Sequence, residues 1–421
     1  MNRRDLFKYT GAAAALGMLS PSLRKLAGAA GTPAQKRLIM VLAQGGWDTT
    51  YALDPKAQSA QVDVPAGAVR SFGNLDVFCD ASRPNVTAFF TKYAPITAVV
   101  RGISVASVAH QECLKRMSTG TRQETNPDMG AIVAHDNGNA LPLPYLILGD
   151  TAFTGEYAVS AGRVGATNQI LALLDPNQAY QTNGKAPLVT TTAEDAILAQ
   201  YANATADRMR ATRGALGYNR KRVEDFVEGI RRGKQLVAVK DGFGSRGRTL
   251  LLSSQVDLAL DALQRDISQA VMLNTRLAWD THDTNTDQAG FHETTFGGLT
   301  QLLDGLAARP GRAAGSTMLD DTIVVCYSEF SRTPKLNAQL GKDHWPVTSA
   351  LVMGAGIKGG RGYGATSDAV EALPVDFTTG TRSATGMTLM SNHFVAGVLK
   401  AAGIDPTTHL GPVEVFDAFV A

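Results

Sequence analysis

The apolar positions of this chain fall into short runs that end at glycines or polar residues. These runs cover residues 38–43, 96–101, 145–148, 322–327 and 349–353. Runs of four to eight apolar residues, rich in branched side chains, are typical of strands that are buried on both faces of a parallel sheet. Residues 111–117 and 392–401 have helical spacing, and the first of these helices should end at Gly120. The pattern therefore predicts an α/β fold.

The middle of the chain has a different pattern. Residues 193–211, 220–237 and 250–274 have helical spacing and many charges, with glycine-rich breaks between them. We interpret roughly 150–270 as a helical insertion in the sheet domain. An equally good interpretation makes these helices the outer layer of the sheet. Residues 52–95 form a polar stretch with few periodic signals.

The first thirty residues have the features of an export signal. Residues 2–8 read NRRDLFK, which matches the twin-arginine pattern, and residues 9–19 form a weakly apolar stretch too short to span a bilayer. Ala27-Gly28-Ala29 is an A-x-A cleavage site. We predict a signal peptide over 1–29, recognised by the twin-arginine translocase, and one periplasmic or secreted domain over 30–421. An uncleaved anchor or a cytoplasmic helix is the alternative.

Composition narrows the classes of function. The 421 residues are 44% apolar and 19% charged, with a net charge of +2. No dense basic stripe with interleaved aromatic residues is present, which argues against nucleic-acid binding. No later run reaches about 18 apolar residues, so we expect no transmembrane anchor in the mature chain. The three cysteines, at 79, 113 and 326, include no CxxC pair, so we predict no disulfide framework, although one disulfide stays possible.

Acidic and histidine residues gather at the ends of the predicted strands. Asp48 follows the first strand through Gly45-Gly46, Glu329 follows 322–327, and His344 precedes 349–353. Ligands of open α/β sheets bind beyond the carboxyl ends of the strands. Mixed carboxylate and imidazole ligands suit Zn, Mn or Fe. These clusters therefore predict a metal site, although each aspartate alone is also a good helix cap.

Four short motifs carry a resemblance to a known family. These motifs are GGWD at 45–48, WDTH at 279–282, SEFSR at 328–332 and DH at 343–344. Their order and spacing, over about residues 36–364, resemble the bacterial family catalogued as domain of unknown function 1501. That family is similar to the alkaline phosphatase and sulfatase superfamily. The resemblance implies a three-layer α/β sandwich with a mostly parallel central sheet and a metal site at the carboxyl edge of its strands.

The resemblance also implies the ligands of that site. It points to one or two divalent metal ions, Zn, Mn or similar. Phe330 stands where the superfamily has a histidine, so one imidazole ligand is absent from the pattern. The implied ligands are Asp48, Asp280, His282, Glu329, Asp343 and His344.

The nucleophile and the substrate contacts stay open at this stage. In the superfamily the nucleophile begins the helix that ends in Thr-Gly, and counting back from Thr119-Gly120 gives His110 rather than a hydroxyl. Ser107 and Thr49 are the alternatives. Arg332, Arg122 and Lys342 are candidates to clamp an anionic substrate, because a guanidinium matches phosphate or sulfate oxygens bidentately and a lysine adds a point charge. The remaining histidines, at 135, 292, 393 and 409, are assigned structural roles.

Two functions follow from these expectations. The first is an exported metal-dependent hydrolase of phosphate or sulfate esters, acting on an anionic small molecule or polymer. The alternative is a catalytically inactive periplasmic binding or assembly protein that retains the fold. The Cys-x-Pro-x-Arg pattern of formylglycine sulfatases is absent from the sequence, so that class of sulfatase is not expected.

Overall fold

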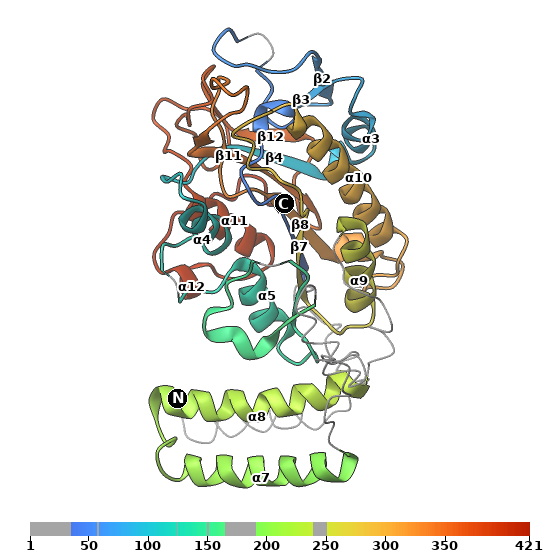
Figure 1. The fold of residues 1–421 in the computed structure, drawn as a ribbon, viewed down its shortest axis with the longest axis vertical. Coiled ribbons are helices and arrows are strands. Elements are labelled where there is room, and N and C mark those ends of the chain that lie inside the picture. The colour runs from blue at the N-terminus through green and yellow to red at the C-terminus, as the bar shows by residue number, and fades with distance from the viewer. Residues whose placement is uncertain (1–34, 57–58, 124, 150, 165–190, 239–250) are drawn as a thin grey trace, which may run out of the picture. The chain divides into compact units, whose positions relative to one another are not determined.

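A mixed eight-stranded sheet forms the centre of the protein in this computed structural model, in the order β12-β4-β11-β8-β1-β7-β5-β6 (Figure 1). Strand β11 pairs antiparallel with β4 and β8, and the other pairings in this sheet are parallel. In chain order the strands are β1 (Arg37–Leu42), β4 (Thr97–Ser104), β5 (Tyr145–Ile147), β6 (Ala161–Arg163), β7 (Ala270–Asn274), β8 (Thr322–Tyr327), β11 (Val347–Gly354) and β12 (Arg361–Gly364).

The structure describes residues 35–56, 59–123, 125–149, 151–164, 191–238 and 251–421. The predicted signal peptide at 1–29 lies outside these residues. So do two segments of the predicted insertion, 165–190 and 239–250. None of the described helices is long and apolar enough to cross a membrane.

Strand β1 shows why this sheet lies between two layers. All six of its residues are buried. Ile39 and Val41 belong to one apolar core, whereas Leu38, Met40 and Leu42 belong to another. Because successive side chains of a strand point to opposite faces, both faces of the sheet are covered.

Helices supply the two outer layers. The first core includes side chains of α3 (Pro84–Tyr93), α9 (Leu252–Gln264) and α10 (Asp287–Ala307). The second includes side chains of α4 (His110–Thr119), α5 (Met129–Gly138) and α11 (Ser391–Ala401). The predicted α/β class, with a mostly parallel sheet in a three-layer sandwich, is confirmed.

Smaller elements complete the described chain. Two hairpins pair β2 (Ala68–Phe72) with β3 (Leu75–Cys79) and β9 (Ser331–Arg332) with β10 (His344–Trp345). The short helices are η1 (Thr49–Tyr51), η2 (Ala94–Ile96), η3 (Gly155–Ser160), η6 (Met318–Asp321) and α12 (Thr407–Leu410).

The helices α7 (Thr192–Arg210) and α8 (Gly217–Ala238) lie side by side within the predicted insertion (Figure 1). The buried Arg232 of α8 donates to the carbonyl oxygens of Leu141 and Asn139, each at 2.7 Å. Helix α9, by contrast, packs on β7 and α10 in the helical layer. The region roughly 150–270 thus combines a helical hairpin with an ordinary layer helix.

The helix expected over 250–274 is wrong in its second half. Helix α9 ends at Gln264, and residues 270–274 form β7, a buried strand beside β1. A short apolar run such as Ala-Val-Met-Leu fits a buried strand as well as a buried helix. Asp266, with a φ of 49°, lies in the turn between the two elements. The polar stretch 52–95 also holds more structure than expected, namely β2, β3 and α3.

Candidate metal centre

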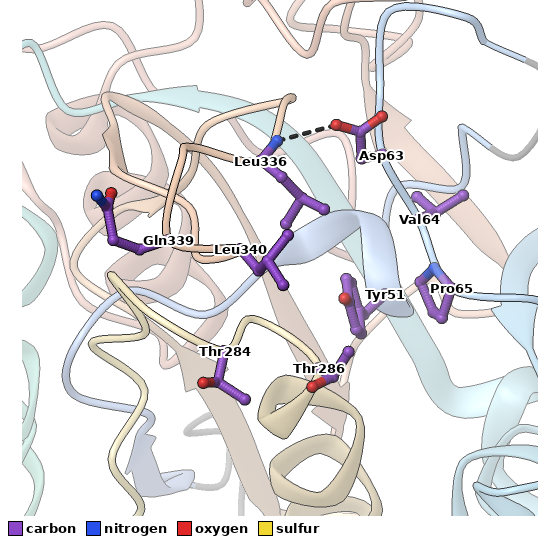
Figure 2. Close-up of a pocket in the computed structure, with 9 residues that line it drawn as sticks. All are labelled: Tyr51, Asp63, Val64, Pro65, Thr284, Thr286, Leu336, Gln339 and Leu340. Carbon is purple, nitrogen blue, oxygen red and sulfur yellow. Dashed lines mark hydrogen bonds between the residues drawn. The ribbon is translucent and has the colours of Figure 1, made fainter.

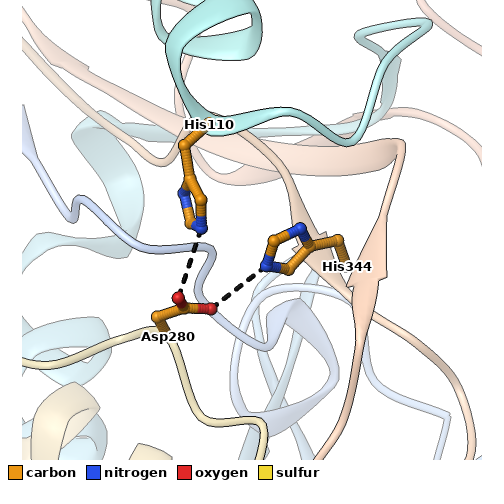
Figure 3. Close-up of side chains that lie close together, drawn as sticks. All are labelled: His110, Asp280 and His344. Carbon is orange, nitrogen blue, oxygen red and sulfur yellow. Dashed lines mark hydrogen bonds and ion pairs between the residues drawn. The ribbon is translucent and has the colours of Figure 1, made fainter.

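Three elements bring His110, Asp280 and His344 together at one edge of the sheet (Figure 3). His110 is the first residue of α4, which follows β4. Asp280 follows β7, and His344 lies in β10, just before β11. Because β11 runs antiparallel to β8, its start lies at the edge where the parallel strands end. One ligand atom from each of the three residues lies within 4.8 Å of the other two.

The Nε2 atoms of three imidazoles converge on the Asp280 carboxylate. His110 Nε2 lies 3.3 Å from Oδ2, and His344 Nε2 lies 3.1 Å from Oδ1. His282 Nε2 lies 3.2 Å from Oδ1 of the same carboxylate. The Nε2 atoms of His282 and His344 are only 3.0 Å apart.

The other ring nitrogen of each histidine faces an acceptor. His110 Nδ1 lies 2.8 Å from Oε1 of Glu329, and His282 Nδ1 lies 2.9 Å from Oδ1 of Asp343. His344 Nδ1 lies 2.8 Å from the carbonyl oxygen of Val108.

These acceptors determine which ring nitrogen carries the proton. A carbonyl or carboxylate oxygen accepts a hydrogen bond, so each Nδ1 donates, and each neutral ring keeps its lone pair on Nε2. Lone pairs at 3.0 Å repel unless a proton or a metal ion lies among them. The donor set therefore fits a cation, and it has the outer hydrogen bonds that are typical of metal-binding histidines.

The buried Glu329 orients His110 by accepting a hydrogen bond from its Nδ1. Its buried carboxylate accepts hydrogen bonds from the Gly45 amide, at 2.8 and 3.0 Å, and from Ser328 Oγ, at 3.1 Å. Gly45 has a φ of 126°, and a Cβ at this position would lie 2.8 Å from the Asp280 amide nitrogen, so glycine is required there. The hydrogen bond that His110 donates to the Glu329 carboxylate raises the pKa of His110.

Arg332 keeps Asp280 ionised. Burial opposes the charge of Asp280, but a hydrogen bond of 2.6 Å from Arg332 Nη2, together with His344 and His110, lowers the pKa of Asp280 to about 2. Arg332 also donates from Nε to the Gly46 carbonyl oxygen and from Nη1 to that of Lys342, at 2.8 and 3.1 Å. Arg332 was predicted to clamp a substrate, but all three of its nitrogens bind the protein.

Asp48 lies outside the cluster and already has a cation. Its Oδ2 accepts from Lys342 Nζ at 2.7 Å and from Asn285 Nδ2 at 3.0 Å. Its Oδ1 accepts from the Thr50 amide and hydroxyl, at 3.0 and 2.6 Å. Both Asp48 and Lys342 are fully buried, so the prediction that Lys342 clamps a substrate is wrong. The predicted first ligand is therefore one half of a buried ion pair, and it also caps η1.

The predicted hydroxyl groups and Arg122 also lie outside the cluster. Ser107 Oγ donates to Glu112 at 2.9 Å, and Arg122 is an exposed partner of the same carboxylate at 3.5 Å. Thr49 is buried, and its Oγ1 lies 3.3 Å from Oγ of Ser331. Of the three nucleophile candidates, only His110 is at the metal centre. Residue types and positions alone do not reveal the Lys342–Asp48 pair or the Val108 carbonyl contact.

Comparison with solved structures finds weak similarity over most of the chain. A lipoteichoic acid synthase from Listeria monocytogenes is 8% identical, with 91% of this chain and 75% of that chain covered and a TM-score of 0.39. An alkaline phosphatase superfamily protein from Vibrio parahaemolyticus is 10% identical, with coverages of 91% and 71% and a TM-score of 0.36. A phosphonate monoester hydrolase of Agrobacterium radiobacter is 10% identical, with coverages of 87% and 74% and a TM-score of 0.31.

A search of curated proteins finds no match. The model of one family does match, over residues 35–413, and that family is described as Protein of unknown function (DUF1501). The match covers nearly all of the described chain, including every residue of the centre, and it confirms the resemblance drawn from the four short motifs. This chain belongs to the DUF1501 family.

Proposed function

We propose that this protein is a divalent-metal-dependent hydrolase of phosphate or sulfate esters. The observation that carries the proposal is the convergence of three imidazole Nε2 atoms on Asp280, each ring held by an acceptor at Nδ1. The twin-arginine motif at residues 2–8 supports export to the periplasm or the medium.

His110, Asp280 and His344 would hold the ion, since these three offer ligand atoms within reach of one another. Three protein ligands with an open position are the pattern of catalytic rather than structural zinc sites. An ion bound there would polarise the ester oxygen and lower the pKa of a water molecule. Glu329 and the Val108 carbonyl oxygen fix the orientation of the two imidazoles, and Arg332 keeps Asp280 charged.

His282 has the arrangement of a general base. Asp343 holds its Nδ1 proton, so the lone pair of Nε2, which lies 3.2 Å from Asp280 Oδ1, would take a proton from a water molecule bound beside the ion. The Asp343 carboxylate would then stabilise the imidazolium, as the aspartate of a Ser-His-Asp triad does. Helix α4 begins at His110, and its free amide groups present the positive end of the helix dipole to an anionic ester.

A metal-reloading assay tests this function. Full-length protein is stripped with chelator, reloaded with Zn²⁺ or Mn²⁺, and assayed on aryl phosphates, phosphodiesters and aryl sulfates. We expect turnover that His344→Gln abolishes. The matched control is His135→Gln, a half-exposed histidine on α5 that pairs with Asp136, and it should leave turnover unchanged. Turnover that survives His344→Gln contradicts the proposed site.

One observation favours the alternative, a binding protein without turnover. The two hydroxyl candidates, Thr49 and Ser107, are engaged elsewhere, and the ring of Phe330 packs against His110 and His344 at centroid distances of 4.8 and 4.4 Å. Stoichiometric metal binding with no hydrolysis of any ester in the panel would support this alternative.

A further inference from the structure

A cavity of about 270 Å³ lies beside the two loops that carry His282 and Asp343 (Figure 2). Leu336 and Leu340 line it from one loop, and Thr284 lines it from the other. Tyr51, Val64 and Pro65 contribute further apolar surface. The volume is slightly below the range of about 300–1,000 Å³ that is usual for drug-sized ligands, so the cavity suits a group about the size of an aromatic ring.

The wall of the cavity suits an uncharged ligand. None of the nine described residues that line it is basic. Its one carboxylate, that of Asp63, is bound by Lys335 Nζ at 3.0 Å and by the Leu336 amide at 2.9 Å. With its charge paired in this way, the carboxylate offers no binding site for a phosphate or sulfate. The Leu340 side chain is 68% exposed, and an apolar ligand would remove such surface from water.

Hydrogen bonds connect the two loops to each other and to the metal centre. The Asn285 amide donates to the Leu340 carbonyl oxygen at 3.0 Å, and Asn337 Nδ2 donates to the His282 carbonyl oxygen at 2.9 Å. Thr284 is two residues beyond His282, and Leu340 is three residues before Asp343. A ligand in the cavity would therefore contact the loops that position the base and its partner carboxylate.

Both loops hold a strained residue at the wall. Thr284 and Leu340 have φ angles of 56° and 60°, in the left-handed region that favours glycine. A β-branched residue such as Thr284 is especially rare there. Such conformations cluster at ligand clamps and active sites.

We propose that this cavity binds the apolar organic group of the ester, an aromatic ring or a branched alkyl group of similar size. The charged part of the ester would lie outside the cavity, on the side of the loops that carry His282 and Asp343. The inference rests on the proposed function and adds the substrate class, namely esters of apolar alcohols or phenols.

A binding measurement tests the cavity without turnover. The probe is 4-fluorophenol, observed by ¹⁹F NMR on full-length, metal-loaded protein. We expect binding that Leu336→Gln and Leu340→Gln each weaken about 10-fold, the usual effect of changing one group in an apolar pocket. The matched control is Leu216→Gln, which changes a leucine that is 84% exposed and does not line the cavity. No binding to the wild type, or equal weakening by the control, overturns the inference.

A selectivity measurement separates this inference from the proposed function. In Leu340→Gln, kcat/KM for 4-fluorophenyl phosphate should fall about 10-fold relative to that for methyl phosphate, with metal content unchanged. Turnover with an unchanged ratio overturns the cavity inference and leaves the hydrolase standing. Probe binding that the leucine variants weaken, with no hydrolysis of either ester, removes the proposed function and with it the cavity's role as a substrate site.

Discussion

Two aspartates at the same edge of the sheet have opposite surroundings. Asp48 is fully buried, and the Lys342 ammonium, an amide side chain and Thr50 engage both of its oxygens. Asp280 is 45% exposed, and three imidazoles direct their Nε2 atoms toward it. Asp48 therefore has both oxygens occupied in the core, whereas Asp280, although it pairs with Arg332 at 2.6 Å, stays partly exposed among three imidazole Nε2 atoms.

The difference shows what makes a carboxylate at a strand end a candidate metal ligand. A place beyond a strand brings a side chain to the ligand-binding edge, but neighbouring side chains decide what the carboxylate holds. Where a buried ammonium group such as that of Lys342 pairs with the carboxylate, the result is a structural ion pair. Where histidines whose Nδ1 atoms already donate to other acceptors surround it, the result is a candidate cation site.

The largest effect should come from breaking the buried pair. Lys342→Met leaves the Asp48 charge without its partner, which costs of order 3–5 kcal/mol of unfolding free energy. Urea unfolding measures this cost. The double variant Asp48→Asn/Lys342→Met removes both charges and should cost less than the sum of the two single variants. Additive costs would mean that the two residues are not coupled.

The second effect falls on metal affinity and not on the fold. His110→Ala removes a ligand from a half-exposed position, so Zn²⁺ affinity should fall by more than about 100-fold, since loss of an outer partner alone costs 10- to 100-fold. The unfolding free energy of the metal-free protein should change by less than about 1 kcal/mol. Competition with a chromophoric chelator measures the affinity. Unchanged affinity would remove His110 from the site.

The third effect is a loss of folding stability at low pH, which should come from the buried His292 beside Asp48. Burial lowers the pKa of His292 to about 3, and its Nε2 lies 3.0 Å from the Asp48 carbonyl oxygen. The unfolded chain takes up this proton near pH 6.5, so stability is complete above pH 6.5 and falls as the pH drops toward 3. Between pH 7.5 and pH 5 the loss from this group should be about 2 kcal/mol.

Urea unfolding of His292→Gln at the same two pH values provides the control. Glutamine keeps an N–H donor but cannot be protonated in this range, so the loss between pH 7.5 and pH 5 should shrink by that amount. If this variant loses as much unfolding free energy between pH 7.5 and pH 5 as the wild type, His292 does not take up a proton on unfolding.

The smallest effect should come from the partner of the proposed base. Asp343→Asn removes the charge that holds His282 but no ligand of the ion. We expect kcat/KM to fall roughly 10- to 100-fold, a part of what general base catalysis contributes, with Zn²⁺ affinity within about 3-fold of the wild type. Steady-state kinetics and the chelator competition separate the two quantities. A parallel loss of affinity would make His282 a ligand instead.

Much of the fold could be predicted from the sequence because it depends on local pattern. The runs at 38–43 and 322–327 are strands, and α4 ends at Gly120, whose φ of 70° suits a helix end. The helix expected over 270–274 failed because four apolar residues have no distinctive period.

The candidate site could be predicted only in part. Asp280 and His344 are predicted from their places at element ends, His282 from the family resemblance, and His110 only as a candidate nucleophile. The structure brings the ligand atoms of all four together. The partner of Asp48 could not be found in this way, because Lys342 lies 294 residues away and a lone lysine has no motif. The role of Arg332 depends on the carbonyl groups of Gly46 and Lys342, which residue types do not report.

The X-ray absorption spectrum of the zinc-loaded, full-length protein tests the central claim most directly. About one zinc ion per chain is expected, with a first shell of nitrogen and oxygen atoms at about 2.0–2.2 Å and the outer-shell scattering of imidazole rings. A shell of oxygen atoms without imidazole scattering, or less than about a tenth of an ion per chain after reloading, would contradict a site built on His110, Asp280 and His344.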